Sequence, residues 1–334
     1  MDPIDPGADA PAGLPRGPHP TVGPGSASMP RWPGVILAVG GVLLAVGSLA
    51  AGTLALDGRL AGLDPATLAW LTLVGALSFT AGLVYSAVRQ LRIRRHLAPE
   101  RYRGPSVLVL LALVLVIASV LTAPFGADAA ALLIGSGEMT LLGSVVLLAS
   151  TQVALLLVSW LFVFRPNALA ALPAFPGPDA GRAVRLGLGW GVAAWLGATL
   201  VSAAVVAVLD AFGIGVEPQA AEAALDLVEP WLAVLAIVIG APIAEEFFFR
   251  GVVFNALRRE RGRWWGYIGS AALFSVIHLS VVALLPIFLL GLALAWVYER
   301  SGSLLAPIVM HAVVNGISVA IALLVRFEVI GLPV

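Results

Sequence analysis

Three charged residues, Glu245, Glu246 and Arg250, lie within an otherwise apolar run, residues 231–257. A charged side chain in the hydrocarbon core of a bilayer costs on the order of a few kcal/mol or more, so such groups need a partner or a solvated pocket. Residues four apart on a helix share a face, whereas adjacent residues diverge by about 100°. Glu246 and Arg250 are therefore predicted to form a structural pair, which leaves Glu245 free for chemistry. The alternative is that both glutamates are structural or reach toward water, but nothing nearby in the sequence could satisfy Glu245.

Two further polar pairs follow in apolar segments, Phe274 with His278 and His311 with Asn315. The members of each pair are four residues apart and so share a helix face. The first pair sets an aromatic wall beside an imidazole, and the second sets an imidazole beside a carboxamide. A lone histidine in an apolar helix is more often a packing residue. Two histidines together with an asparagine and an unpaired glutamate favour a functional site.

The chemistry predicted for these residues is hydrolysis of a peptide bond inside the membrane. A carboxyl group in a low-dielectric surrounding suits general-base work. Glu245, helped by His278, could deprotonate a water that attacks a peptide carbonyl. His311 and Asn315 could donate hydrogen bonds to the oxyanion that develops. The residues expected to support this site are Glu246, Arg250 and Phe274.

A zinc-dependent mechanism is the alternative for the same side chains. His278, His311 and Glu245 could supply the three protein ligands of a catalytic zinc. The HExxH motif is absent, so the sequence does not require zinc and no cofactor is favoured. Serine hydrolysis is less attractive, since Ser275 and Ser280 flank His278 without motif context. The chain contains no cysteine, which excludes thiol nucleophiles, thiolate metal sites and disulfides.

The composition is that of a membrane protein. The chain has 334 residues, of which 60% are hydrophobic and 11% are charged, and its mean hydropathy is +1.00. Soluble domains carry roughly 25% charged residues. The net charge of zero gives no indication of nucleic-acid binding. The partners expected are therefore membrane lipid and a peptide or membrane-protein substrate.

Apolar stretches long enough to cross a bilayer, about 20 residues, occur eight times. They lie at roughly 34–56, 67–88, 105–126, 140–164, 184–209, 231–257, 264–283 and 304–325. A shorter stretch at 284–298 has Pro286 near its start, which is expected to mark a bend after the preceding helix. We count this stretch as a membrane segment. The predicted fold is all-α, a polytopic transmembrane helical bundle of about eight full spans plus one short membrane helix.

Arginine is concentrated in alternate loops, which predicts the orientation of the chain. The basic loops are 89–103, 165–185 and 250–263, whereas the loops between them, 57–66, 127–139 and 210–229, hold almost no basic residue. By the positive-inside rule the N-terminus and the basic loops are cytoplasmic and the C-terminus lies outside. With a rise of 1.5 Å per residue, the four candidate catalytic side chains then lie about 12–22 Å from the cytoplasmic helix ends. A shared site at one depth is therefore feasible.

Glycines recur on two of the predicted spans, where small residues let helices pack closely. We expect packing seams at Gly187, Gly191, Gly40, Gly41 and Gly47.

The three polar motifs together resemble the signature of the CPBP family of intramembrane proteases, which includes the type II CAAX prenyl proteases and bacteriocin-processing or immunity proteins. The family pattern EExxxR, FxxxH and HxxxN stands here as Glu245-Glu246-FFF-Arg250, Phe274-SVI-His278 and His311-AVV-Asn315. The likeness covers about residues 230–320. It implies an endopeptidase in which Glu245 and His278 activate water and His311 with Asn315 forms the oxyanion site. Members of the family were first described as metalloproteases. The glutamate-based mechanism, which we favour, needs no metal.

The composition and the resemblance together predict three parts of the chain. We expect a disordered, Pro-, Gly- and Ala-rich cytoplasmic tail at 1–33, N-terminal transmembrane helices at 34–180, and the CPBP-like protease domain at 181–328. We expect a multi-pass protein of the cell membrane. The composition indicates that this membrane is a bacterial plasma membrane. The rival function is a transporter or binding protein whose buried Glu, Arg and His handle protons or substrate, but no internal repeat of the kind common in transporters is visible. An inactive membrane scaffold is a third option, which the intact motifs disfavour.

Overall fold

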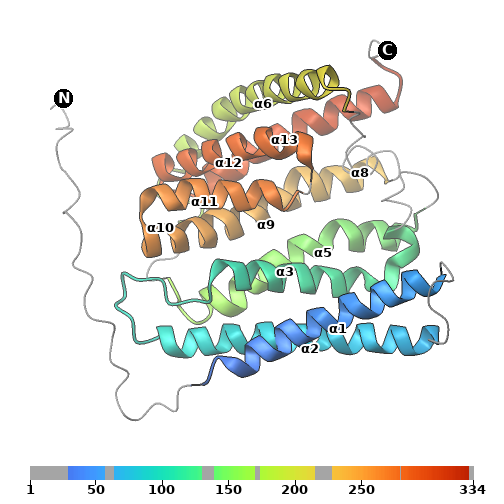
Figure 1. The fold of residues 1–334 in the computed structure, drawn as a ribbon. Coiled ribbons are helices and arrows are strands. Elements are labelled where there is room, and N and C mark those ends of the chain that lie inside the picture. Colours follow the sequence, from blue (N-terminus) through green and yellow to red (C-terminus); the bar gives the residue numbers. More distant parts are fainter. Residues whose placement is uncertain are drawn as a thin grey trace. The chain divides into compact units, whose positions relative to one another are not determined.

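The computed structural model describes residues 29–56, 64–129, 139–169, 174–214, 228–278 and 280–330. Arg31–Val334 form one compact unit, and the residues up to Pro30 form a separate one. Within the described ranges every regular element is a helix (Figure 1), so the predicted all-α class is confirmed. The predicted tail at 1–33 lies almost wholly outside the described residues, and the first helix begins at Trp32.

Five apolar runs form the helices of the first part of the unit. These are α1 (Trp32–Leu56), α2 (Pro65–Arg94), α3 (Val107–Thr122) with the 3₁₀ turn η1 (Ala123–Phe125), α5 (Leu141–Ser159) with the π-helical turn η2 (Trp160–Phe164), and α6 (Ala180–Ala211). Polar residues just before three of these helices cap their free N–H groups. Asp64 accepts from Thr67 N, Thr140 from Gly143 N, and Asp179 from Arg182 N. The caps explain why these helices start where they do.

The remaining helices, with the turn after the third-last of them, hold all three polar motifs. One composite helix runs from Pro230 to Arg261 and consists of α8 (Pro230–Ala233), π-helical η3 (Val234–Gly240), α9 (Ala241–Glu246), π-helical η4 (Phe247–Phe254) and α10 (Asn255–Arg261). It is followed by α11 (Arg263–Val276), α12 (Val281–Ser301) and α13 (Leu305–Arg326). Glu245 and Glu246 thus end a short α-helical piece between two π-helical stretches.

Eight of the described helical stretches are long and apolar enough to cross a bilayer. The predicted number of full spans is confirmed, but the short segment is a different one. It is α11, with 14 residues, whereas α12 has 21 residues and includes the stretch 284–298. The chain turns at Ile277 and His278, and the Ser280 hydroxyl caps α12 by accepting from Ala283 N. Pro286 lies inside α12, so the boundary between the two helices comes before this residue and not at it.

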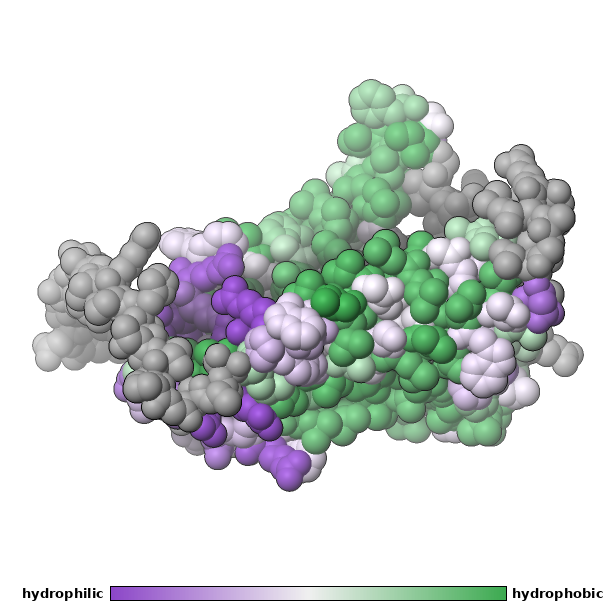
Figure 2. Space-filling model, turned by 60° about the horizontal axis from the view of Figure 1, so that its bottom comes forward, coloured by the Kyte–Doolittle hydropathy of each residue, from purple (hydrophilic) through white to green (hydrophobic). Residues whose placement is uncertain are grey.

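The described connections between helices lie at two ends of the bundle, as alternating helix directions require. At one end Arg94 binds Glu260 at 2.6 Å, Arg263 binds Glu299 at 2.7 Å, and the Leu304 N–H donates to Ala174 O. At the other end Arg326 donates to Val228 O at 2.9 Å. Figure 2 shows hydrophilic residues concentrated at one end of the face that it presents, with hydrophobic surface over most of the rest. This distribution is that of a multi-pass membrane protein, and the cytoplasmic placement of the N-terminus stays a prediction.

Close helix packing depends on some of the glycines that the sequence singled out. A β-carbon on Gly187 would lie 2.7 Å from Ala306 O, and one on Gly191 would lie 2.7 Å from Val313 Cβ, so α6 packs tightly on α13. Gly41 in α1 has equally little room against α2. These packing seams are confirmed. Gly40 and Gly47 face open space, so the seams predicted there are wrong.

This packing yields a stability prediction with a matched control on the same helix. We expect Gly187→Ala to lower the free energy of unfolding by about 1–3 kcal/mol, because the added methyl group has to push α13 away. A β-carbon on Gly189, two residues along, would have no neighbouring atom within 4 Å. Gly189→Ala should therefore leave stability unchanged or raise it by up to about 1 kcal/mol through helix propensity. Thermal unfolding in detergent measures both variants, and equal stabilities would contradict the packing seam.

Candidate active site

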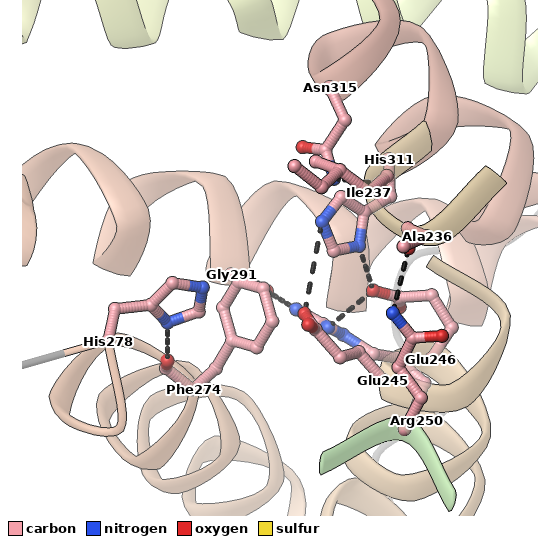
Figure 3. Close-up of polar contacts among 11 residues, drawn as sticks. Ala236, Ile237, Glu245, Glu246, Arg250, Phe274, His278, Gly291, His311 and Asn315 are labelled. Carbon is pink, nitrogen blue, oxygen red and sulfur yellow. Dashed lines mark hydrogen bonds and ion pairs between the residues drawn. The ribbon is translucent and has the colours of Figure 1, made fainter. Parts of the chain in front are cut away.

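Glu246 is the central residue of the polar cluster. Its side chain is fully buried, and its Oε1 accepts from Arg250 NH1 at 2.8 Å and from His311 Nδ1 at 2.9 Å (Figure 3). The pair with Arg250 has the predicted four-residue spacing. The bond to His311 was not predicted, because 65 residues separate the two in the sequence. Glu246 therefore joins the composite helix to α13.

Arg250 is also fully buried and is held from three sides. Besides the bond to Glu246, its NH2 donates to Gly291 O on α12 at 3.0 Å, and its guanidinium lies 4.6 Å from the centroid of the Phe274 ring on α11. A buried guanidinium needs such acceptors and a π face, since its charge is otherwise uncompensated. Phe274 thus lies directly against the buried guanidinium.

Glu245, the neighbour of Glu246 in the chain, makes contacts of its own. Its Oε2 is buried and accepts no hydrogen bond from any described residue, while the side chain as a whole is 17% exposed. Oε2 lies 3.9 Å from His311 Nε2, beyond direct hydrogen-bond length. Glu246 Oε2 also lacks a partner among the described residues, but the charge of that carboxylate is balanced by Arg250. Glu245 is the carboxylate left available for chemistry.

The hydrogen bond to Glu246 fixes the proton of His311. An ionised carboxylate paired with Arg250 only accepts hydrogen bonds, so His311 Nδ1 must carry a hydrogen. The other ring nitrogen, Nε2, faces Glu245 Oε2. It presents a lone pair when the imidazole is neutral and an N–H when the ring takes a second proton. The Glu245 carboxylate oxygen and the His311 Nε2 atom therefore face each other across 3.9 Å.

His278 lies on the exposed turn between α11 and α12. Its Nδ1 is bonded to Phe274 O at 2.7 Å, and its ring meets the Phe274 ring at a centroid distance of 5.0 Å. The same Phe274 ring lies 5.7 Å from the His311 ring, so it has an imidazole on each side (Figure 3). The sequence predicted a common cavity for Glu245, His278 and His311. The structure brings Glu245 and His311 together and joins His278 to them through Phe274.

Asn315 lies one turn beyond His311 on α13 and is half-buried. Its Nδ2 donates to Ile237 O in η3 at 2.8 Å. One of its two amide hydrogens is thus used in holding the composite helix, and the other is left for a further acceptor.

The three side chains that could hold zinc are not grouped around one point in this structure. A catalytic zinc needs its protein ligands at about 2 Å from one point. In the part of the chain that the structure describes, no three His, Cys, Asp or Glu side chains are grouped so that they could hold a metal ion. His278, His311 and Glu245 therefore do not form the three-ligand set that the sequence left open.

Sequence reasoning missed one residue at this site, Gln152 on α5. Its Nε2 donates to Ala236 O in η3 at 2.8 Å, next to the bond from Asn315. The available signal was a lone amide in the apolar run Leu141–Ser159, because a polar side chain within a membrane span is a candidate functional residue.

Comparisons with known proteins concern mainly the part of the chain that holds the three motifs. Residues 227–317 match the profile of a family described as type II CAAX prenyl endopeptidase Rce1-like. The chain is similar to the candidate membrane peptidase YdiL of Bacillus subtilis (strain 168), with 30% identity over 106 residues, which cover 31% of this chain and 43% of that protein. It is also similar to an uncharacterized 24.3 kDa protein of Escherichia coli, with 35% identity over 85 residues, 24% of this chain and 39% of that protein.

The resemblance to the type II CAAX prenyl proteases is thereby confirmed for the motif region. The chain spans about two fifths of the length of these two relatives. No solved structure matches the chain.

Proposed function

We propose that this protein is an intramembrane endopeptidase that hydrolyses a peptide bond of a membrane-associated or peptide substrate. The observation that carries the proposal is the buried Glu245 Oε2, which has no hydrogen-bond partner among the described residues and lies 3.9 Å from His311 Nε2. An ionisable oxygen without a hydrogen-bond partner inside a membrane protein costs free energy. Its presence therefore indicates a functional site. The match of residues 227–317 to a family of membrane endopeptidases supports the same assignment.

In the proposed mechanism Glu245 is the general base. It takes a proton from a water molecule, the water oxygen attacks the carbonyl carbon of the substrate, and the carbonyl oxygen becomes an oxyanion. The remaining N–H of Asn315 and the Nε2–H of a doubly protonated His311 donate to that oxyanion. The tetrahedral intermediate then collapses, the C–N bond breaks, and Glu245 returns its proton to the leaving amine.

His278 is proposed to help Glu245 by orienting the water. Phe274 O is an acceptor, so His278 Nδ1 carries the hydrogen, and Nε2 presents a lone pair when the ring is neutral. An imidazole in this tautomer can accept a hydrogen bond from water. Its exposed position on the turn after α11 suits a residue that meets water or substrate on the way to Glu245.

The substrate class is proposed from chemistry and from the comparisons together. The family whose profile matches residues 227–317 is described as type II CAAX prenyl endopeptidase Rce1-like, and we extend to this chain only the peptide bond in a membrane setting. A pair of quenched fluorescent peptides, one with a farnesylated cysteine and one unmodified, measures whether a prenyl group raises cleavage. We further propose a bacterial plasma membrane as the location, with the N-terminus in the cytoplasm.

Comparative membrane proteomics tests the proposed activity even before a substrate has been identified. Cells that produce the wild-type protein are compared with cells that produce Glu245→Ala at the same level. We expect uncut membrane-associated peptides to accumulate with the variant and their fragments to appear with the wild type. Identical peptide profiles, with both proteins inserted in the membrane, would contradict the endopeptidase assignment.

Metal removal has a definite expected outcome. Because the candidate ligands are not grouped for a metal ion in the described part of the chain, we expect cleavage to continue undiminished after dialysis against EDTA. Elemental analysis of the purified protein should give zinc well below one equivalent. A zinc-dependent peptidase treated in parallel serves as the control for chelation. Loss of activity on dialysis with recovery on adding zinc would instead establish a metal mechanism.

A further inference from the structure

Two carboxamides from two different helices hold consecutive carbonyl groups of η3. Gln152 on α5 donates to Ala236 O, and Asn315 on α13 donates to Ile237 O, each at 2.8 Å. Gln152 also lies outside residues 227–317, the region shared with the endopeptidase family. The Gln152 bond therefore links the N-terminal helices to the helix that carries Glu245.

The sequence explains why Ile237 O needs a donor from elsewhere. In α-helical geometry this carbonyl would accept from residue 241, and in π-helical geometry from residue 242. The Ala241 N–H is already bonded to Ala236 O, and residue 242 is a proline, which has no N–H. The Asn315 amide replaces the missing donor. Ala236 O accepts twice, from Ala241 N and from Gln152 Nε2.

Gly240 completes the contact with Gln152. A β-carbon at this position would collide with Gln152 Oε1. The glycine thus lets the carboxamide lie flat against the π-helical turn, with its Oε1 beside Gly240 and its Nε2 on Ala236 O.

The geometry points to Gln152 as a positioning residue for Glu245. A π-helical turn inserts one residue relative to an α-helix, and each residue turns a helix by about 100°. If η3 relaxed to α-helical geometry, α9 would rotate by about that angle against α13, and Glu245 Oε2 would leave His311 Nε2. By holding Ala236 O, Gln152 keeps η3 in the π-helical form and so sets the direction of the general base. This inference rests on the proposed endopeptidase activity.

The test uses the full-length protein and the two quenched peptides. In Gln152→Met the side chain keeps its length and loses its amide. We expect kcat to fall by about 100-fold or more, because a displacement of the base by only about 1 Å already costs about 100-fold, with KM unchanged. Gln90→Met is the matched control, because Gln90 likewise bonds to a backbone group, Ser106 N, far from the site along the chain. That control should keep the wild-type kcat.

A double-variant cycle gives a readout that does not need substrate. Gly240→Ala should displace the Gln152 carboxamide and lower the unfolding midpoint, as Gln152→Ala does by deleting it. In the Gln152→Ala background, Gly240→Ala should cause little further loss, because the collision is gone. Strictly additive losses would overturn the inferred contact.

The outcomes separate this inference from the proposed function. If wild type cleaves a peptide and Glu245→Gln does not, wild-type kcat in Gln152→Met overturns the positioning role alone. If wild type and Glu245→Gln are equally inactive, the endopeptidase proposal fails, and the unfolding cycle still decides whether Gln152 holds η3.

Discussion

Replacing Glu245 by glutamine should abolish peptide cleavage while the protein stays folded and inserted. The substitution preserves the shape of the side chain but removes the group that can take a proton from water. General-base catalysis is worth about 10²–10⁴-fold in rate, so kcat should fall by at least about a hundredfold. Stability should change little, because Oε2 accepts no hydrogen bond from the described residues. Peptide cleavage by purified protein and thermal unfolding measure the two quantities.

The control is Glu260→Gln, since Glu260 lies on the same composite helix but binds Arg94 at the loop end of the bundle. That variant should cleave at the wild-type rate. Cleavage at the wild-type rate by Glu245→Gln would remove Glu245 from the role of base, and Glu246 would then be the next candidate, because its Oε2 also has no partner among the described residues.

Removing either member of the buried pair should produce the largest loss of stability. Glu246 and Arg250 are both fully buried and 2.8 Å apart. Deleting one charge leaves the other without compensation, which costs about 3–5 kcal/mol. We expect this loss for Arg250→Ala and for Glu246→Ala, measured by unfolding in detergent. Glu246→Ala should also lower activity, because His311 Nδ1 loses its acceptor.

Two comparisons make this prediction specific. Arg263→Ala removes an ion pair of a mostly exposed arginine, whose side chain is 62% exposed, and should cost about 1 kcal/mol or less. The double variant Glu246→Met/Arg250→Met removes both buried charges and should recover part of the stability lost in each single variant. Its activity should stay low, since His311 remains without its partner. Equal losses for Arg250→Ala and Arg263→Ala would contradict the account of the pair.

Local features of the site could be predicted because helix geometry fixes them. The four-residue spacing sets Glu246 beside Arg250 and Phe274 beside His278, wherever the rest of the chain lies. The position next to Glu246 directs Glu245 elsewhere. The boundary between α11 and α12 could not be predicted in this way, because residues 264–298 are almost uniformly apolar and hydropathy marks no turn within them. The Ser280 cap, a weak local signal, decides it.

By itself, the sequence determined that the protein is a polytopic α-helical membrane protein, that three intramembrane polar motifs exist, and that Glu246 pairs with Arg250. Composition and helix periodicity suffice for these, since each depends on residues within a few turns. Only the tertiary structure decided that His311 binds Glu246, that Phe274 lies between the two imidazoles, and that Gln152 reaches η3 from α5. These hydrogen bonds join residues that are 65 or 84 positions apart, so they depend on how whole helices pack. Helix packing in turn depends on the fit of all the side chains at the interface.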